Sequence, residues 1–256
     1  MRFGLLFLFL FSSFLKADTI TITADEWCPY NCSQDAKDRG FLVDIFTYIF
    51  EKAGHQVEYT VATSYEQAIK DVREHKIDAI IGSTHEETPD FIFPAIPLAY
   101  SYDVIITKKS STWRYTSEKS LNQVCLGVIK NYAYDEGITE HINKNQHNSK
   151  KVQMVSGNNA LAYNLRKLRY KKITALIDDQ LLIRYHYAQR KEPFPFKIAH
   201  KLETYPLYIS FSPKDYKSKA HAQLLSKGIK ELQGSEVLTK ILKKYGLSEE
   251  DILKPQ

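Results

Sequence analysis

The chain has 256 residues, of which 43% are hydrophobic, and its 35 Lys and Arg residues outnumber its 30 Asp and Glu residues, for a formal net charge of +5. This length and apolar share are sufficient for a substantial core, in one large domain or two smaller ones, and they exclude an unfolded chain. The positive excess is small and spread along the sequence, so the composition also argues against a nucleic-acid-binding protein.

The N-terminus has the pattern of a secretory signal peptide. Arg2 precedes an apolar run from Phe3 to Leu10, and Ala17 supplies a small residue where cleavage can occur. The run is too short to favour a permanent membrane anchor, and no later apolar segment reaches the length that spans a bilayer. We therefore expect residues 1–17 to be a signal peptide cleaved near Ala17, and the mature chain to reside in the periplasm.

The first predicted strand, Thr19–Ala24, leads into the stretch Asp25–Cys32, which has the sequence DEWCPYNC. In an oxidising compartment the C-x-x-x-C spacing of Cys28 and Cys32 favours a disulfide, because a tight turn brings the two Cα atoms to about 5–6 Å. Free thiols, a redox pair and a metal site are the less favoured alternatives. A redox pair typically has C-x-x-C at a helix N-terminus, and a zinc site needs four ligands.

After this stretch, helices and strands alternate. Residues 40–54 place apolar side chains on one helical face, and residues 57–61 have the alternation of a strand. Ser64 then begins a second helix with a capping box, and Ile77–Ile81 is a short apolar strand, as expected when both faces of a sheet are covered. This order of elements predicts an α/β sheet that is mainly parallel.

The same pattern restarts after residue 123. Two α/β units in succession, followed by two amphipathic helices, indicate two lobes with a cleft between them. Strands are expected at 124–129, 151–155, 174–177, 196–200 and 207–212, and helices near 133–142, after Asn158 or Asn159, and from Asp179.

Polar and aromatic side chains follow several of these strands, at the carboxyl ends where α/β sheets bind ligands. Several of the loops precede helices, whose N-terminal N–H groups favour an anionic ligand group. This convergence predicts a site for a small polar ligand. The candidate ligand-binding residues are Asp25, Trp27, Tyr30, Ser83, Thr84, Tyr132, Tyr134, Asn158 and Asp179.

Several of these candidates also have a purely structural interpretation. Trp27 and Tyr30 could pack beside the disulfide, and Thr84 could stabilise a turn. Only one of the two tyrosines in the segment KNYAY needs to face a ligand. Asp179 could be the N-cap of the helix that follows it instead of a ligand-binding carboxylate.

The order and spacing of the motifs resemble the bacterial extracellular solute-binding proteins of family 3, the polar amino acid type, over essentially the whole mature chain. The resemblance implies a two-lobed α/β fold like that of periplasmic binding proteins of the second topology class, with two hinge crossovers and a ligand cleft between the lobes. Lobe 1 would comprise 18–106 and 206–256, and lobe 2 would comprise 107–205, with hinges near Ile105–Lys108 and Leu202–Leu207. The matching segments are WCPY, GFLVDIFTYIFEKAG, IDAIIGST, FIFPAIPLAY, SLNQVCLGVIKNYAY, NNALAYNLRKLRYKKITALIDD and LQGSEVLTKILKKYG.

One feature of the amino acid binders in this family is missing. In those proteins an Arg shortly after the G-x-T turn binds the α-carboxylate of the substrate, and the nearest counterpart here is Thr88. A hydroxyl does not replace a bidentate guanidinium, so a standard L-amino acid is not the expected ligand. Asp179 does match the carboxylate of the second lobe that binds the ligand's amino group. The resemblance therefore points to a ligand with an amine or cationic end.

We expect a monomeric solute-binding protein that captures a small polar solute, amino acid-like or amine-containing, and presents it to a separate membrane transporter. The alternatives are a ligand-sensing subunit for a membrane receptor or kinase, and a dehydratase-like enzyme on the same fold. The sequence contains no G-x-S-x-G, H-E-x-x-H or G-x-G-x-x-G motif. We therefore expect no catalytic residue, no cofactor, no metal and no nucleic-acid partner.

Overall fold

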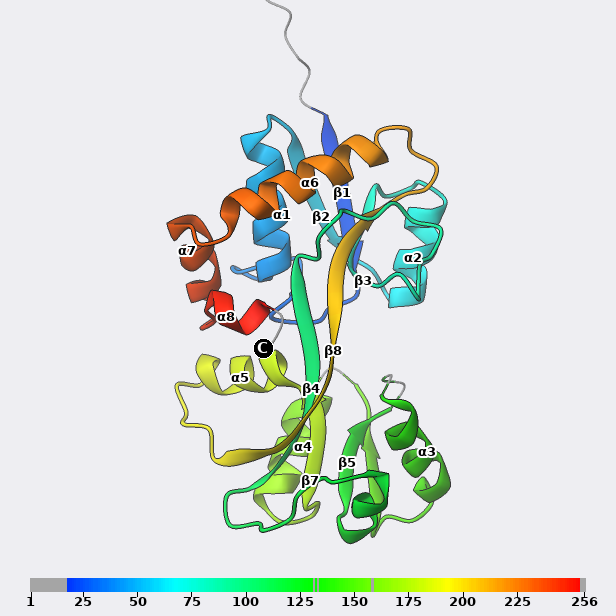
Figure 1. Ribbon diagram of the computed structural model, residues 1–256, viewed down its shortest axis with the longest axis vertical. Coiled ribbons are helices and arrows are strands. Elements are labelled where there is room, and N and C mark those ends of the chain that lie inside the picture. Colours follow the sequence, from blue (N-terminus) through cyan, green and yellow to red (C-terminus); the bar gives the residue numbers. More distant parts are fainter. Residues whose placement is uncertain (1–17, 131, 133, 158, 254–256) are drawn as a thin grey trace, which may run out of the picture.

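The computed structural model of the protein describes residues 18–130, 132, 134–157 and 159–253. The predicted signal peptide, 1–17, and the predicted ligand-binding residue Asn158 lie outside the described residues. Within this described part, no helix is both long and apolar enough to cross a lipid bilayer. The chain forms two α/β lobes connected by two long strands, which confirms the predicted fold class (Figure 1).

A single mixed sheet of eight strands runs through both lobes. The strands are β1 (Thr19–Ala24), β2 (Gln56–Val61), β3 (Ala79–Ser83), β4 (Ala99–Lys108), β5 (Leu126–Ile129), β6 (Val152–Val155), β7 (Ala175–Asp179) and β8 (Phe196–Phe211). Their order across the sheet is β2-β1-β3-β8-β4-β7-β5-β6. The outer strands of each lobe pair in parallel, whereas β4 and β8 are antiparallel to their neighbours. The two central strands therefore connect two parallel half-sheets.

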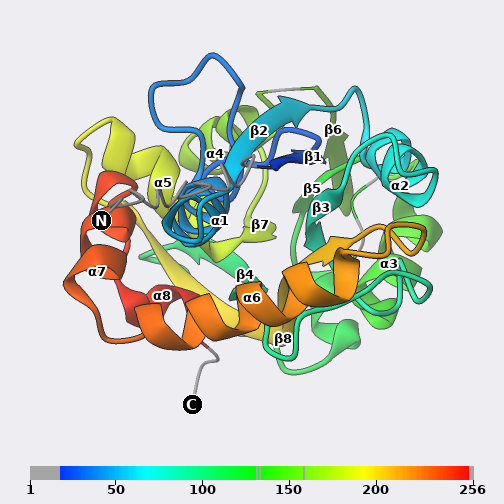
Figure 2. The same ribbon diagram turned by 90° about the horizontal axis from the view of Figure 1, so that it is seen from above.

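Helices cover both faces of the sheet. They are α1 (Phe41–Lys52), α2 (Tyr65–Arg73), α3 (Glu136–Asn145), α4 (Ala160–Arg169), α5 (Gln180–Gln189), α6 (Ser218–Leu232), α7 (Glu236–Lys244) and α8 (Glu249–Ile252), with a 3-10 helix at Glu118–Gln123. We define lobe 1 as β1–β3 with α1, α2 and α6–α8, and lobe 2 as β5–β7 with α3–α5. The view along the long axis places α1 and α2 on opposite sides of β1–β3 (Figure 2).

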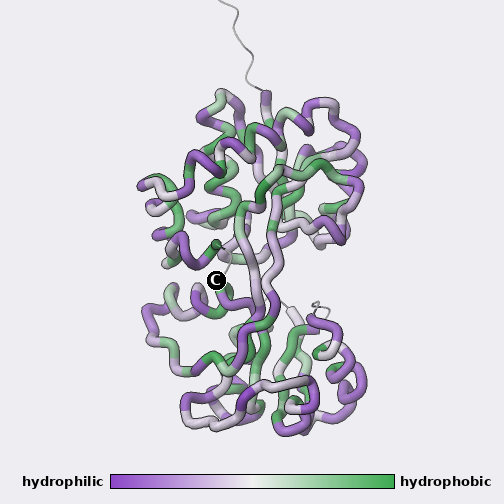
Figure 3. The backbone as a smooth tube through the Cα atoms, in the orientation of Figure 1, coloured by the Kyte–Doolittle hydropathy of each residue, from purple (hydrophilic) through white to green (hydrophobic). Residues whose placement is uncertain are grey.

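Apolar side chains on the inner helix faces form the core of lobe 1. Phe41, Phe46 and Phe50 of α1 are fully buried, and the last two rings stack with their centroids 4.1 Å apart. Leu181 and Leu182, at the start of α5 in lobe 2, belong to the same apolar cluster. Hydrophobic residues follow the strands and the inner helix faces in both lobes (Figure 3). The core of lobe 1 therefore continues into lobe 2 where α5 begins.

The second central strand differs from the prediction. The sequence predicts two separate strands at 196–200 and 207–212, but β8 is continuous from Phe196 to Phe211, through Pro206. Around this proline β8 pairs with β4, whereas β3 pairs with β8 only from Tyr208 onwards. One edge of β8 is therefore open at this point, and a strand with an open edge tolerates a proline.

The strands β4 and β8 cross between the lobes side by side (Figure 1). The predicted hinge at 202–207 lies in β8 opposite residues 99–102 of β4. The predicted hinge at Ile105–Lys108 instead lies within lobe 2, where it pairs with the first part of β8 and with β7. The crossing in β4 therefore comes earlier in the chain than the sequence suggests, and the lobe boundaries at 106 and 206 stay a prediction.

Candidate ligand-binding site

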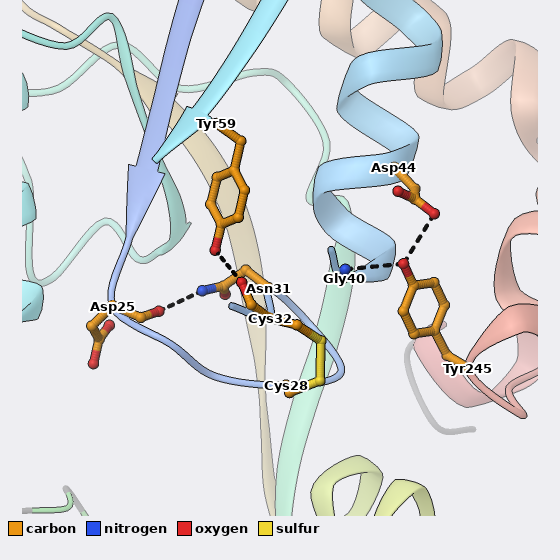
Figure 4. Close-up of a disulfide and its surroundings, with 8 residues drawn as sticks. All are labelled: Asp25, Cys28, Asn31, Cys32, Gly40, Asp44, Tyr59 and Tyr245. Carbon is orange, nitrogen blue, oxygen red and sulfur yellow. Dashed lines mark hydrogen bonds between the residues drawn. A yellow bond between two sulfur atoms is a disulfide. The ribbon is translucent and has the colours of Figure 1, made fainter. Parts of the chain in front are cut away.

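The segment Asp25–Cys32, here called the disulfide loop, follows the carboxyl end of β1. Cys28 and Cys32 form a disulfide with their Cα atoms 4.4 Å apart, which confirms the predicted pairing. The hydroxyl of Tyr59, on β2, donates to the main-chain carbonyl of Cys32 at 2.7 Å (Figure 4). The disulfide and this bond fix the loop against lobe 1.

Gly40 allows α1 to begin directly behind the disulfide loop. Its φ is +111°, and a Cβ at this position would lie 2.4 Å from the Cα of Asn31 and from the carbonyl oxygen of Tyr30. Its N–H donates to the hydroxyl of Tyr245 at 2.9 Å, and that hydroxyl donates to the carboxylate of Asp44 at 3.0 Å (Figure 4). Glycine is therefore required here, and the loop is supported from behind by α1 and the C-terminal helices.

The two aromatic residues of the loop stack on each other and have different surroundings. The rings of Trp27 and Tyr30 are nearly parallel, with their centroids 3.9 Å apart. Tyr30 is fully buried, whereas Trp27 is partly exposed and forms part of a wall between the lobes. Trp27 therefore presents an immobilised aromatic face to the space between the lobes.

That space is a cleft of about 600 Å³, a size typical of sites for small molecules. Lobe 1 lines it with the disulfide loop and the residues after β2, and lobe 2 lines it with the residues after β5, the start of α4 and one face of α5. Of the predicted ligand-binding residues, Asp25, Trp27 and Tyr132 line the cleft. The other polar and charged lining residues are not among the predicted ligand-binding residues, and they include Glu26, Thr63, Lys130, Tyr185, Gln189 and Arg190.

Five of the described candidates lie outside this lining, namely Tyr30, Asp179, Ser83, Thr84 and Tyr134. The buried hydroxyl of Ser83 lies 2.6 Å from a serine hydroxyl of β8. The hydroxyl of Thr84 donates to the carboxylate of Glu87 at 2.8 Å, which is the turn interaction that the sequence offers as its alternative. The hydroxyl of Tyr134 accepts the N–H of Ile129 at 2.9 Å. Ser83, Thr84 and Tyr134 are engaged within their own lobes, and their contact with a ligand stays a prediction.

Asp179 is the N-cap of α5 and also links the two lobes. One carboxylate oxygen accepts the N–H groups of Leu181 and Leu182 at 2.8 and 3.0 Å. The other oxygen accepts the hydroxyl of Tyr30 at 2.9 Å and the hydroxyl of Ser101, on β4, at 2.6 Å. Burial raises the pKa of Asp179, and these hydrogen bonds oppose that rise. The carboxylate is therefore satisfied without a ligand, and a ligand contact at Asp179 stays a prediction.

Two further aspartates, Asp103 and Asp178, are neighbours of Asp179 in the sheet and have fewer hydrogen-bond partners. Asp103, on β4, pairs in register with Asp179, and burial together with the nearby carboxylates of Asp179 and Asp135 raises its pKa to about 8. Asp178 is 1% exposed. One of its oxygens accepts the N–H of Asp179 at 2.9 Å, and the other has no hydrogen-bond partner among the described residues. We call Asp103 and Asp178 the acidic pair.

The acidic pair lies close to the cleft. Burial, with the help of four nearby carboxylates, raises the pKa of the cleft residue Tyr132 to about 12. These carboxylates belong to Asp178, Asp25, Asp179 and Asp103. None of the ion pairs between described residues includes any of the four. Four carboxyl groups therefore lie near Tyr132 without an ion-pair partner among the described residues.

A family model matches residues 20–248 of this chain, and the family comprises bacterial extracellular solute-binding proteins, family 3. The chain belongs to this family. No curated protein matches it significantly.

Solved structures of solute-binding proteins share the fold. An ancestral arginine-binding protein bound to arginine has 19% identity and a TM-score of 0.62, with 89% of this chain and 97% of that chain covered. Substrate-binding domain 2 of GlnP from Lactococcus lactis, in an open conformation, has 20% identity and a TM-score of 0.61, with 90% and 96% covered. A histidine kinase sensor domain with similarity to periplasmic binding proteins has 16% identity and a TM-score of 0.64, with 93% and 99% covered. Identities this low establish the shared fold alone.

Thr88 is the residue that the sequence resemblance places nearest to the family's carboxylate-binding Arg. Thr88 is fully buried, and its hydroxyl donates to the carbonyl of Thr84 at 3.1 Å. Cations line the cleft from the opposite lobe instead, at Lys130 after β5 and at Arg190 at the end of α5. Neither cation forms an ion pair with another described residue. Both are available to an anionic group in the cleft.

Proposed function

We propose that this family 3 protein is a periplasmic solute-binding protein that captures a small amine-containing solute between its lobes and presents it to a membrane transporter. The family, the cleft lined by both lobes and the aromatic wall at Trp27 support capture of a small polar molecule. The acidic pair supports an amine or another cationic group at one end of that molecule.

Asp178 is buried and Asp103 is half-buried. The acidic pair carries this proposal because an ionised carboxylate is unfavourable when it is removed from water without a partner. Such a group keeps its proton or acquires a cation. Burial and the neighbouring carboxylates raise the pKa of both Asp103 and Asp178. An ammonium or guanidinium group bound beside Tyr132 would replace the retained proton and neutralise the pair. Because the two carboxyl groups are already in place, binding of the cation would require little rearrangement of the protein.

The cations in the cleft lining support an additional, anionic group on the ligand. Lys130 and Arg190 line lobe 2, whereas Asp25 and Glu26 line lobe 1. A ligand with separated positive and negative ends would pair with both sets of charges. This arrangement fits an amino acid-like zwitterion whose carboxylate is bound by lobe 2, instead of by the family's usual Arg.

Thermal unfolding against a panel of solutes tests this proposal. The panel contains basic amino acids, neutral amino acids, diamines and dicarboxylates, and a bound ligand raises the melting temperature by mass action. We expect basic amino acids or diamines to give the largest rise. The rise should be lost in Asp103→Asn and kept in Asp35→Asn, a matched change at an exposed aspartate away from the cleft. A rise with dicarboxylates alone, or an undiminished rise in Asp103→Asn, would contradict the proposal.

The transporter partner is tested separately from the ligand. A transporter partner would allow vesicles that contain the permease to accumulate the solute only when the protein is added. A sensing partner would instead give ligand-dependent kinase activity in a receptor and no accumulation. Either result leaves the capture step intact, because both partners bind a ligand-closed protein.

A further inference from the structure

A second group of chemically active side chains lies in lobe 1, outside the cleft lining. His75 follows α2, Asp78 precedes β3, and Asp215 lies between β8 and α6. The Nε2 atom of His75 is 3.2 Å from Oδ1 of Asp78 and 3.9 Å from Oδ2 of Asp215. One ligand atom from each residue lies within 4.8 Å of the other two. We call these three residues the His–Asp–Asp group.

Each carboxylate in the group is held by its outer oxygen. Oδ2 of Asp78 accepts the N–H and the hydroxyl of Thr21, both at 2.7 Å. Oδ1 of Asp215 accepts the N–H of Lys217 at 3.0 Å. The remaining oxygen of each carboxylate is the one near His75. Hydrogen bonds of this kind orient the carboxylate ligands of metal sites.

Two of the lysines close in sequence to the group, Lys217 and Lys76, have other partners. The Nζ atom of Lys217 is 2.6 Å from the carboxylate of Asp18. Lys76 pairs with Glu74 at 2.7 Å and with Asp71 at 3.5 Å. Neither lysine forms an ion pair with Asp78 or Asp215 among the described residues. Among the described residues, the ion pairs of Asp78 and Asp215 are those with His75.

We propose that His75, Asp78 and Asp215 bind a divalent transition-metal ion, with Zn²⁺ as the best fit. Two carboxylates neutralise a divalent charge, and an imidazole nitrogen favours zinc over magnesium or calcium. A tetrahedral zinc ion with bonds of about 2.0–2.2 Å separates its ligand atoms by about 3.3 Å. The pair of His75 and Asp78 already has this separation, whereas the Asp215 oxygen, 3.9 Å from His75 and within 4.8 Å of the Asp78 oxygen, has to move closer.

The surroundings leave room for water as the fourth ligand, because the side chains of His75 and Asp78 are 37% and 22% exposed. A bound ion would join the turn between α2 and β3 to the segment that leads into α6. These segments are far apart in the sequence and all belong to lobe 1. The ion would therefore stabilise lobe 1 without closing the cleft.

Metal titration of the untagged mature chain tests the site. After chelator treatment and dialysis, we expect the chain to bind one Zn²⁺ and to unfold at a higher temperature in its presence. Co²⁺ in the same site should give the intense visible absorption of a tetrahedral ion. His75→Gln and Asp215→Asn should each lose the bound ion and the temperature rise. His147→Gln changes an exposed histidine of lobe 2 and should keep both.

The alternative interpretation is a protonated His75 that forms ion pairs with both aspartates and needs no metal. It predicts no zinc binding by the wild type, and that result would overturn the proposal. Equal zinc binding by wild type and by a folded His75→Gln variant would overturn it as well. Asp215→Asn provides the same test if His75→Gln fails to fold, as judged by circular dichroism. A cleft ligand should still stabilise both variants, so the site and the proposed function can fail independently.

Discussion

Two buried aspartates, Asp178 and Asp179, follow each other at the end of β7, and the second caps α5. Asp179 is 3% exposed and accepts four hydrogen bonds, two from the helix and two from hydroxyls of other elements. Asp178 is 1% exposed and leaves one oxygen without a partner among the described residues. The comparison separates a carboxylate whose oxygens are both hydrogen-bonded from one with an unpaired oxygen, beside which we propose that a cation binds. Burial alone does not distinguish them, whereas hydrogen-bond satisfaction does.

Replacing each of these aspartates in turn should give the largest difference in the free energy of unfolding. Asp179→Ala removes a helix cap and leaves buried donors unpaired, so we expect the free energy of unfolding to fall by about 3–5 kcal/mol. Asp178→Asn keeps the bond to the N–H of Asp179 and removes an uncompensated acid, so we expect a change within about 1 kcal/mol. Urea denaturation followed by circular dichroism measures both values.

The ligand response of these variants sharpens the comparison. Asp178→Asn should fold normally and respond less to an amine that stabilises the wild type. An Asp179→Ala variant with unchanged stability and lost ligand binding would reverse the two roles. It would make Asp179 the ligand-binding carboxylate that the family resemblance implies.

The pH dependence of stability provides the next test, and the expected change in stability is of intermediate size. The pKa of Asp103 is raised to about 8 by burial and by neighbouring carboxylates, whereas an aspartate in the unfolded chain titrates near 3.9. Between about pH 4 and pH 8 the folded protein therefore holds a proton that the unfolded chain has released. The contribution of Asp103 to stability is complete below about pH 4 and is lost as the pH rises to 8, by at most about 1.4 kcal/mol per pH unit.

Urea midpoints at several pH values between 5 and 8 measure this slope, compared with Asp103→Asn, which cannot titrate. We expect a flatter profile in the variant and a wild-type profile in the control Asp35→Asn. The same slope in the wild type and in Asp103→Asn would mean that Asp103 is ionised in the folded protein. The acidic pair would then no longer favour a cationic ligand.

Much of the fold follows from the sequence because its signals are local. Alternating and apolar segments predict most of the strands, and Ser64 accepts the N–H of Gln67 at 3.2 Å as a predicted helix cap. The disulfide follows from spacing and compartment, and it is present. The continuity of β8 through Pro206 could not be predicted, because it depends on the partner strand β4, which is distant in the sequence.

The site was only partly predictable for the same reason. Asp25, Trp27 and Tyr132 line the cleft because they follow strands at their carboxyl ends, a rule that uses local sequence. Asp103 lies inside the central strand β4, where the sequence predicts only a connection between lobes. A carboxylate directly between Tyr102 and Val104, within a strand segment, was the signal available. Only the pairing of β4 with β7 places Asp103 beside Asp179.

The last prediction concerns the bond between Tyr30 and Asp179, which joins residues 149 positions apart and from different lobes. Tyr30→Phe removes the hydroxyl and keeps the ring that stacks on Trp27. Asp179 keeps the hydroxyl of Ser101 and both helix N–H groups, so we expect a loss of about 1.5 kcal/mol in the free energy of unfolding. Because the lost bond crosses between the lobes, the lobes of the ligand-free variant should also open more readily. X-ray scattering should then give a larger radius of gyration. A loss of stability with unchanged dimensions would show that the bond supports the core at α5 without restraining the lobes, and Asp179 would then be a helix cap alone.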